Sequence, residues 1–123
     1  MKYLFLLNTA DDGPPGDPAS PEYAELYAQY GKALAAMQEA GVLLDCAPLT
    51  GWSSATTVRV RDGETILTDG PAAEIKEQCG GYTLLECADL DEALRWAAMI
   101  PAAWTGSVEV RTVINTQAPQ PPR

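Results

Sequence analysis

Two kinds of hydrophobic spacing alternate along the chain and predict its elements. The every-second-residue spacing of strands occurs in residues 1–8, 42–49, 56–61, 64–69, 82–87 and 107–114. The three-to-four-residue spacing of helices occurs in residues 21–40 and 90–100. The order is then strand, helix, strand, hairpin, strand, helix, strand. It predicts an α+β, ferredoxin-like fold, in which both helices lie on one face of an antiparallel sheet and a β-hairpin is added.

The first helix has a clear beginning and end. Ser20 is an N-cap residue, and Pro21 follows at the first helical position, where its missing N–H breaks no hydrogen bond. Gly41 supplies the left-handed residue that ends the helix. The apolar stripe contains Tyr23, Leu26, Tyr27, Tyr30, Leu34 and Met37. We expect this stripe to belong to the core, although a phenol near the start of the helix also has the reach to enter a cleft.

The second helix begins with a capping box. In Asp89-Leu90-Asp91-Glu92, the first aspartate accepts an N–H of the first turn while Glu92 reaches back to the chain before it. Pro101 ends the helix. The predicted buried stripe contains Leu90, Ala93, Leu94 and Ala97.

Asp62-Gly63 predicts a tight hairpin, because this dipeptide tolerates the positive φ angles of a two-residue type I′ turn. The turn fixes the register, with Arg61 opposite Glu64 and Thr56 opposite Asp69. The alternation then sorts the side chains into two faces. One face carries Val58, Val60, Leu67 and Asp69, and the other carries Arg59, Arg61, Glu64 and Ile66.

Glycine and proline punctuate the rest of the chain. Gly70-Pro71 breaks the hairpin strand, and we expect about one helical turn over 72–79 before Gly80-Gly81 frees the backbone. Residues 9–19 are rich in Pro, Gly and Asp and predict a connecting loop, with a lid over a cleft as the alternative. We assign residues 1–114 to one domain and the Pro-rich residues 115–123 to a disordered tail.

Composition excludes several classes of function. The net charge of −9 disfavours nucleic acid and anionic membrane surfaces as partners, and no apolar run is long enough to span a membrane. We therefore expect a cytoplasmic protein. Cys46, Cys79 and Cys87 have no metal-binding or disulfide spacing, and histidine is absent, so we expect no metal and no cofactor.

One combined motif resembles a known family. The run TTVRVRDG, then TDGP, AEIKEQCGGY and GSVEVR, is similar to YCII-related proteins of the DGPF subgroup, except that Ala72 replaces the phenylalanine of the subgroup's name. The resemblance implies a ferredoxin-like unit that pairs into a dimeric α/β barrel, without one shared activity. It also implies a link to alternative sigma factors of RNA polymerase. A His–Asp pair is associated with dehydrochlorinase-type relatives, and this chain has no histidine to supply it.

The candidate site lies beside the Asp69-Gly70-Pro71 corner. Asp69 is the candidate catalytic acid or base, and Lys76, Glu77, Tyr82 and Arg111 are candidate binding residues. The site predicts binding or conversion of a small molecule. The structural alternatives are that Asp69 caps the turn, that Lys76 and Glu77 form a solvated face, and that Arg111 only forms a cross-strand pair.

Two further expectations concern partners. Residues 1–8 are apolar on both faces, and two helices cannot cover both faces of the sheet, so we expect a homodimer formed by the uncovered sheet faces. The alternative to a small-molecule site is a non-catalytic regulatory or adaptor protein associated with an alternative sigma factor. Its acidic surface would then engage a basic partner.

Overall fold

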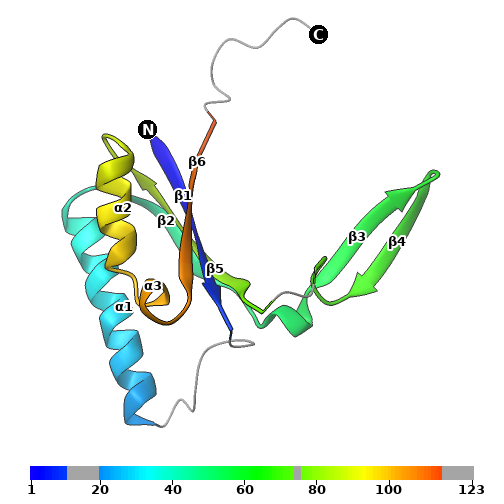
Figure 1. The fold of residues 1–123 in the computed structure, drawn as a ribbon, viewed down its shortest axis with the longest axis horizontal. Coiled ribbons are helices and arrows are strands. Elements are labelled where there is room, and N and C mark those ends of the chain that lie inside the picture. Colours follow the sequence, from blue (N-terminus) through cyan, green and yellow to red (C-terminus); the bar gives the residue numbers. More distant parts are fainter. Residues whose placement is uncertain (11–19, 74–75, 115–123) are drawn as a thin grey trace, which may run out of the picture.

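The computed structural model describes residues 1–10, 20–73 and 76–114, and Figure 1 shows how they are arranged. This part of the chain is α+β with antiparallel sheets, as the hydrophobic spacing predicts. The elements in chain order are β1 (Lys2–Thr9), α1 (Pro21–Glu39), β2 (Leu43–Pro48), the 3₁₀ turn η1 (Trp52–Ser54), β3 (Thr56–Arg61), β4 (Glu64–Asp69), β5 (Gln78–Glu86), α2 (Leu90–Ala98), α3 (Ala102–Thr105) and β6 (Ser107–Thr112).

Four strands form the main sheet in the order β2-β5-β1-β6, with all neighbours antiparallel. The helices lie on one face of this sheet (Figure 1). Along β1, Tyr3 and Phe5 point toward the helices and are buried, whereas Leu4 and Leu6 point to the other face and are half-buried. We call that second face the open sheet face. It carries Leu4, Leu6, Asp45, Tyr82, Leu84, Glu86, Glu109 and Arg111.

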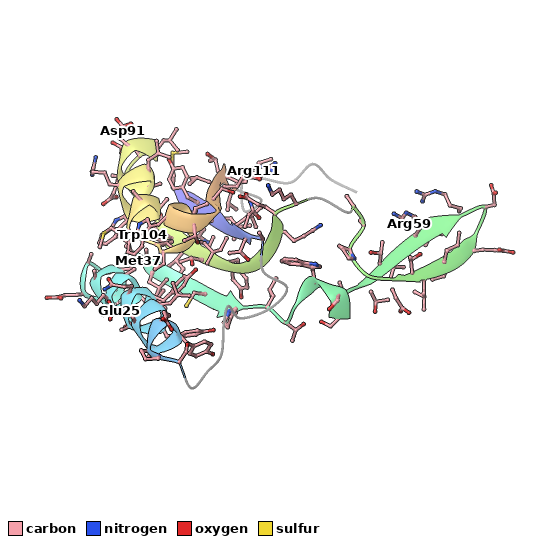
Figure 2. The ribbon with its side chains drawn as sticks, turned by 60° about the horizontal axis from the view of Figure 1, so that its bottom comes forward. Glu25, Met37, Arg59, Asp91, Trp104 and Arg111 are labelled. Atoms are coloured by element: carbon pink, nitrogen blue, oxygen red, sulfur yellow. The ribbon has the colours of Figure 1, made fainter. Side chains whose placement is uncertain are left out.

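The core fills the space between the helices and the sheet. Phe5, Met37 and Leu85 are fully buried there, and the labelled Met37 lies on the side of α1 that faces the sheet (Figure 2). Transfer of these side chains from water to the interior, roughly 1.5–3 kcal/mol for each, is the main term that holds the helices to the sheet.

The capping prediction for α2 is confirmed. Oδ1 of Asp89 accepts the Glu92 N–H at 2.9 Å, and Oε1 of Glu92 accepts the Ala88 N–H at 2.7 Å. The predicted stripe is wrong in part, because Leu90 and Leu94 are about half exposed. Ala93 and Ala97 alone of the four are buried. Their small side chains let the helix lie close to the sheet, and this turns the adjacent leucine row to solvent.

The hairpin prediction is confirmed residue by residue. Arg61 pairs with Glu64 and Thr56 with Asp69, and the turn residues Asp62 and Gly63 have φ angles of 52° and 77°. Both angles lie in the left-handed region that a type I′ turn requires. The hairpin forms its own two-stranded sheet, which extends away from the main sheet on the side opposite the helices (Figure 1).

The prediction that Gly80-Gly81 precedes the next strand is wrong. Strand β5 begins at Gln78, so the helical turn predicted over 72–79 does not extend into its last two residues. The register of β1 against β5 shifts between Leu7 and Asn8, and Gly80 is the extra residue on β5. A glycine fits such a bulge, where a strand bends and leaves one residue unpaired.

The remaining differences from the prediction concern short or irregular segments. Helix α3 was not predicted, because its four residues are too few to show a helical period. In β2 the register shifts between Leu43 and Asp45, so Leu44 points outward and is about half exposed. Most of the predicted loop at 9–19 and the whole tail at 115–123 lie outside the described residues. No helix in the described ranges is long and apolar enough to cross a membrane.

Candidate functional site

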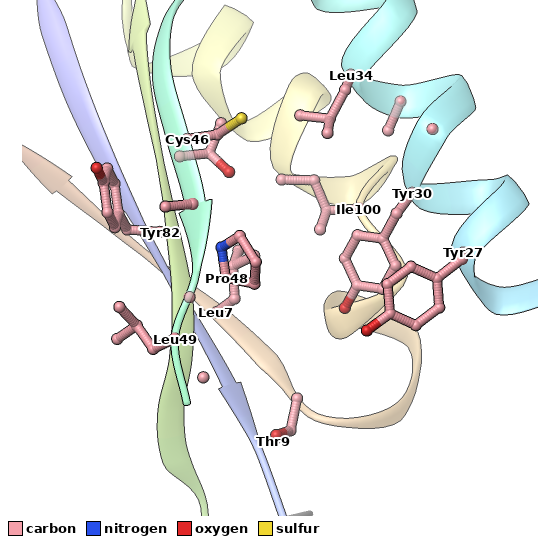
Figure 3. Close-up of a pocket in the computed structure, with 16 residues that line it drawn as sticks. Leu7, Thr9, Tyr27, Tyr30, Leu34, Cys46, Pro48, Leu49, Tyr82 and Ile100 are labelled. Atoms are coloured by element: carbon pink, nitrogen blue, oxygen red, sulfur yellow. The ribbon is translucent and has the colours of Figure 1, made fainter. Parts of the chain in front are cut away.

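A pocket of about 360 Å³ lies between α1 and the main sheet (Figure 3). We call it the α1–sheet pocket. Residues from α1, β1, β2 and β5 line it, together with Ile100 after α2. Its volume falls within the range of roughly 300–1,000 Å³ that is typical of small-molecule sites.

The α1 wall of the pocket follows one stripe of the helix. Tyr27, Tyr30, Gly31 and Leu34 are spaced three or four residues apart, so they share one face. The phenol oxygens of Tyr27 and Tyr30 point toward the strands (Figure 3). The prediction that the tyrosine stripe belongs to the core is therefore wrong in part, since Tyr27 is 42% exposed and the pocket stands where core atoms were expected.

Three tyrosines support one another along α1. The rings of Tyr23 and Tyr27 are stacked with centroids 4.4 Å apart, and the rings of Tyr27 and Tyr30 lie 6.3 Å apart. Such contacts between aromatic rings contribute about 0.5–1.5 kcal/mol beyond the area they bury. The stack holds the Tyr27 ring in the α1 wall of the pocket.

The opposite wall comes from the strands. Leu7 of β1 and Pro48 of β2 are apolar, and the Cys46 thiol points toward α1 (Figure 3). Tyr82 borders the pocket, but its ring lies on the other side of the strands from α1. Among the described residues, the lining is thus mostly hydrocarbon with a few hydroxyl groups and one thiol.

The phenols that face the pocket hold their protons. Hydrogen bonding with the Tyr23 phenol, followed by burial, raises the pKa of Tyr27 to about 12. Burial raises the pKa of Tyr30, and a hydrogen bond from the Ala102 backbone acts in the opposite direction. No lining residue in the described ranges carries a charged side chain. At neutral pH the pocket therefore offers neutral hydroxyl donors and no ionic partner.

Gly31 keeps this wall open. It lies in the interior of α1, where glycine costs roughly 0.5–1 kcal/mol of stability relative to alanine. A Cβ atom built at this position would meet nothing within 4 Å. A mid-helix glycine beside open space indicates a position where a side chain would narrow the pocket. This glycine in the helix interior is the one local sequence feature that marks the α1 wall, and it does not by itself predict a pocket.

The residues predicted for the site do not line this pocket, apart from Tyr82. The Ser107 hydroxyl donates to Oε2 of Glu77 at 3.0 Å, and Arg111 donates from Nη1 to Oε2 of Glu109 at 3.2 Å. Arg111 lies on the main sheet and Arg59 on the distant hairpin (Figure 2). Lys76 follows the hairpin corner as part of a bend.

The corner after Asp69 is held by hydrogen bonds to both backbone groups of Gly70. The Gly70 N–H donates to the Ala55 carbonyl at 2.7 Å, and the Thr57 hydroxyl donates to the Gly70 carbonyl at 2.7 Å. Asp69 itself is exposed at the end of β4. It shares a face with Val58 and Leu67, as predicted, but that face is exposed, so this chain alone supplies no apolar enclosure for the carboxylate.

No cluster suited to a metal ion is present in the described ranges, where no three Cys, Asp or Glu side chains come together. Cys46 and Cys79 are free and half-buried, and Cys87 is free and buried. Burial is the main reason that the pKa of Cys87 lies above its ordinary value.

Comparison with known proteins gives one family and one curated relative. A family model described as the YCII-related domain matches residues 1–117. The uncharacterized protein R00369 of Rhizobium meliloti (strain 1021) is 51% identical over 75 residues, which are 59% of this chain and 60% of that protein. The aligned part thus spans less than two thirds of the relative. The narrower DGPF subgroup stays a prediction from the combined motif that runs from TTVRVRDG to GSVEVR.

Proposed function

The chain belongs to the YCII-related domain family, and from its pocket we propose that it binds a small, neutral and largely apolar molecule. The observation that supports this proposal is the lining of the α1–sheet pocket. It combines apolar walls with phenol donors that stay protonated. Small-molecule sites typically have this composition, in which a few polar groups orient a ligand that apolar contacts retain.

The charge of the pocket restricts the ligand class. A carboxylate or phosphate would leave water without gaining an ionic partner, because the described lining contains no lysine or arginine. The net charge of −9 also repels anions. A cation would find no carboxylate in the lining. A neutral molecule with a hydrogen-bond acceptor, such as a ketone, an ether or an aromatic carbonyl compound, matches the hydroxyl of Tyr30, since the proton of Tyr27 is already engaged by the Tyr23 phenol.

A pair of dyes tests the proposal. N-phenyl-1-naphthylamine is neutral and fluoresces in apolar surroundings, and its 8-sulfonate has the same rings with one negative charge. We expect saturable enhancement of the neutral dye's fluorescence at one dye per chain. Binding of the sulfonate should be at least about tenfold weaker, the factor that corresponds to about 1.4 kcal/mol.

Two variants at one position provide the matched control. Gly31→Leu places a side chain at the open wall and should abolish saturable binding, whereas Gly31→Ala should retain it within a few-fold. Both replacements have higher helix propensity than glycine, so loss of α1 would not explain the result. Equal dye binding by Gly31→Leu and the parent would reject the α1–sheet pocket as the site.

The alternative of a regulatory or adaptor protein for a sigma factor has one supporting observation, the net charge of −9. An acidic surface also serves to keep proteins soluble, so this support is weak. Retention of a sigma factor in a pull-down, lost at moderate salt, would favour this alternative. We prefer the small-molecule proposal to this alternative, because the pocket restricts the ligand by shape and by charge.

A further inference from the structure

We propose that a shallow groove between α1 and α3 binds an organic ammonium cation, such as a small quaternary amine. We call it the Trp104 groove, because Trp104 of α3 lines one of its sides. The other side, formed by the first turns of α1, contains Pro21, Glu22, Glu25, Leu26 and Gln29. The groove shares no lining residue with the α1–sheet pocket, so this site is independent of the ligand proposed there.

The α1 side of the groove combines hydrocarbon with negative charge. Glu22, Glu25, Leu26 and Gln29 are three or four residues apart, so they share one face of the helix. Gln29 donates from Nε2 to Oε1 of Glu25 at 2.8 Å, which restricts the position of this carboxylate. Within the described ranges neither glutamate forms a salt bridge, and the sequence has no lysine or arginine between residues 20 and 31. In this part of the chain, no cationic side chain balances the two carboxylates.

The indole of Trp104 supplies an aromatic surface on the opposite side of the groove. Its ring N–H donates to the Ala98 carbonyl at 3.0 Å, so the donor is already used and the ring is held in place. Tryptophan is highly buried on average in proteins, yet Trp104 is 58% exposed. The face of an indole ring carries negative potential and attracts a cation that lies within about 6 Å of the ring centre.

Contacts within the protein join the two sides of the groove. The Ala102 backbone donates a hydrogen bond to the Tyr30 phenol, which connects the start of α3 to the middle of α1. Ala102 is also buried in the core. Figure 2 shows Glu25 on α1 and Trp104 on α3. Because these contacts form the groove before a ligand arrives, binding does not have to order it first.

Helix stability accounts for only one side of the groove. An acidic residue in the first turn interacts favourably with the positive end of the helix dipole, and this gives Glu22 a structural role in α1. That role does not explain why an exposed indole is held opposite the glutamates. A bound cation explains both sides, because the carboxylates and the indole face attract it together.

The lining also selects the kind of cation. Calcium takes about six to eight oxygen ligands and magnesium a nearly octahedral set, whereas this lining is mostly apolar. A strongly hydrated ion would lose water there without replacement. A quaternary ammonium group presents its charge through methyl groups, which can contact Leu26 and the indole of Trp104 while Glu22 and Glu25 balance the charge. The net charge of −9 further raises the concentration of cations near the surface.

Choline and 3,3-dimethylbutan-1-ol test the proposal, because the alcohol has the same shape with a neutral carbon in place of the charged nitrogen. NMR titration of the parent chain follows the indole N–H signal of Trp104, with the signals of Trp52 and Trp96 as references. Choline chloride replaces sodium chloride at constant ionic strength, so the screening of surface charge stays the same. We expect choline to shift the Trp104 signal saturably, and the alcohol to bind at least about fivefold more weakly.

Two matched pairs of variants separate the groove from general attraction by an acidic protein. Glu25→Gln should weaken choline binding at least about threefold, and Glu39→Gln, at the other end of α1, should change it less than about 1.5-fold. Trp104→Leu should weaken binding at least about threefold, whereas Trp104→Phe keeps an aromatic ring and should bind more tightly than Trp104→Leu. The backbone amide signals of Leu26 and Thr105 report binding in the variants that lack the indole.

Three results would overturn the proposal. The first is equal binding of choline and the alcohol, or no saturation below about 100 mM choline. The second is equal weakening by Glu25→Gln and Glu39→Gln, because the net charge of the protein would then explain the binding. The third is a Trp104→Leu variant that binds choline as tightly as the parent, because the indole would then have no part in the site.

Discussion

The Tyr82 phenol donates a hydrogen bond of 2.8 Å to Oδ2 of Asp45, from strand β5 to its neighbour β2 on the open sheet face. This bond requires the phenol proton, and together with burial it raises the pKa of Tyr82. The sequence predicted Tyr82 as a ligand-binding residue. In the structure its hydroxyl is already engaged by a carboxylate, away from α1.

The pair predicts a specific pH dependence of stability. Because the folded state holds the Tyr82 proton more strongly than the unfolded state, the stabilisation is fully present below the ordinary tyrosine pKa of about 10. It is lost as pH rises through the higher folded pKa. Between about pH 9 and pH 11, the parent should therefore lose more melting temperature than Tyr82→Phe does. Thermal unfolding at fixed protein concentration measures this, and parallel curves for the two proteins would contradict it.

Asp69 gives a second prediction, because its surroundings differ from those expected for a buried acid. It is exposed at the end of the hairpin and does not line the α1–sheet pocket. Asp69→Asn should change the free energy of unfolding by less than about 0.5 kcal/mol, as for most surface substitutions. It should also leave binding of the neutral dye unchanged.

Asp69→Ala tests the remaining alternative, in which the Asp69 carboxylate caps the turn. If the carboxylate caps the turn after Gly70, alanine should cost roughly 0.5–2 kcal/mol, measured by urea unfolding. If Asp69→Asn instead folds as well as the parent and lowers dye affinity by a large factor, Asp69 acts at the ligand site. That outcome would move the site from α1 to the corner.

The fold was predictable from the sequence wherever a short motif strongly favours one local structure. Asp62-Gly63 fixed the hairpin register, and the Asp89–Glu92 box fixed the start of α2. These signals act over two to four residues, so long-range packing does not override them. The same is true of the cap at Ser20, whose Oγ accepts the Tyr23 N–H at 3.1 Å.

The pocket was not predictable in this way, because it depends on how far α1 stands from the sheet. An apolar stripe indicates that Tyr27, Tyr30 and Leu34 share a face, but the same stripe suits a filled core and a cavity wall. The exposure of Leu67 has the same origin. Alternation assigns the residue to a face of the hairpin, and only tertiary structure shows whether that face is covered.

Gly31 gives a third prediction, on stability alone. Gly31→Ala should raise the free energy of unfolding by about 0.5–1 kcal/mol, because alanine has the higher helix propensity and its Cβ meets no neighbouring atom. Ala35, exposed on the same helix, is the matched control. Ala35→Gly should lower stability by a similar amount. If Gly31→Ala is neutral or destabilising while Ala35→Gly behaves as expected, a Cβ atom at position 31 meets neighbouring atoms in solution.

The last prediction uses three glycines near the starts of strands β5 and β6, which differ in what a Cβ atom would meet. At Gly80 the nearest atom lies 3.6 Å away, which is ordinary van der Waals contact. At Gly81 the carbonyl oxygen of Ala47 lies 3.0 Å away, so β2 would have to move slightly. At Gly106 a Cβ would overlap the carbonyl oxygen of Asn8, and that atom belongs to the backbone of the central strand β1.

Alanine substitutions should therefore destabilise in the order Gly80, Gly81, Gly106. We expect less than about 1 kcal/mol at Gly80, and at least about 2 kcal/mol at Gly106, because overlap with backbone cannot be relieved by rotating a side chain. Urea unfolding of the three variants measures the order, and an unchanged slope with denaturant shows that the same surface is exposed in each. If Gly80→Ala and Gly106→Ala lose equal stability, the contact between position 106 and the Asn8 carbonyl of β1 has no special cost. The glycine before β6 would then be explained by its backbone conformation alone.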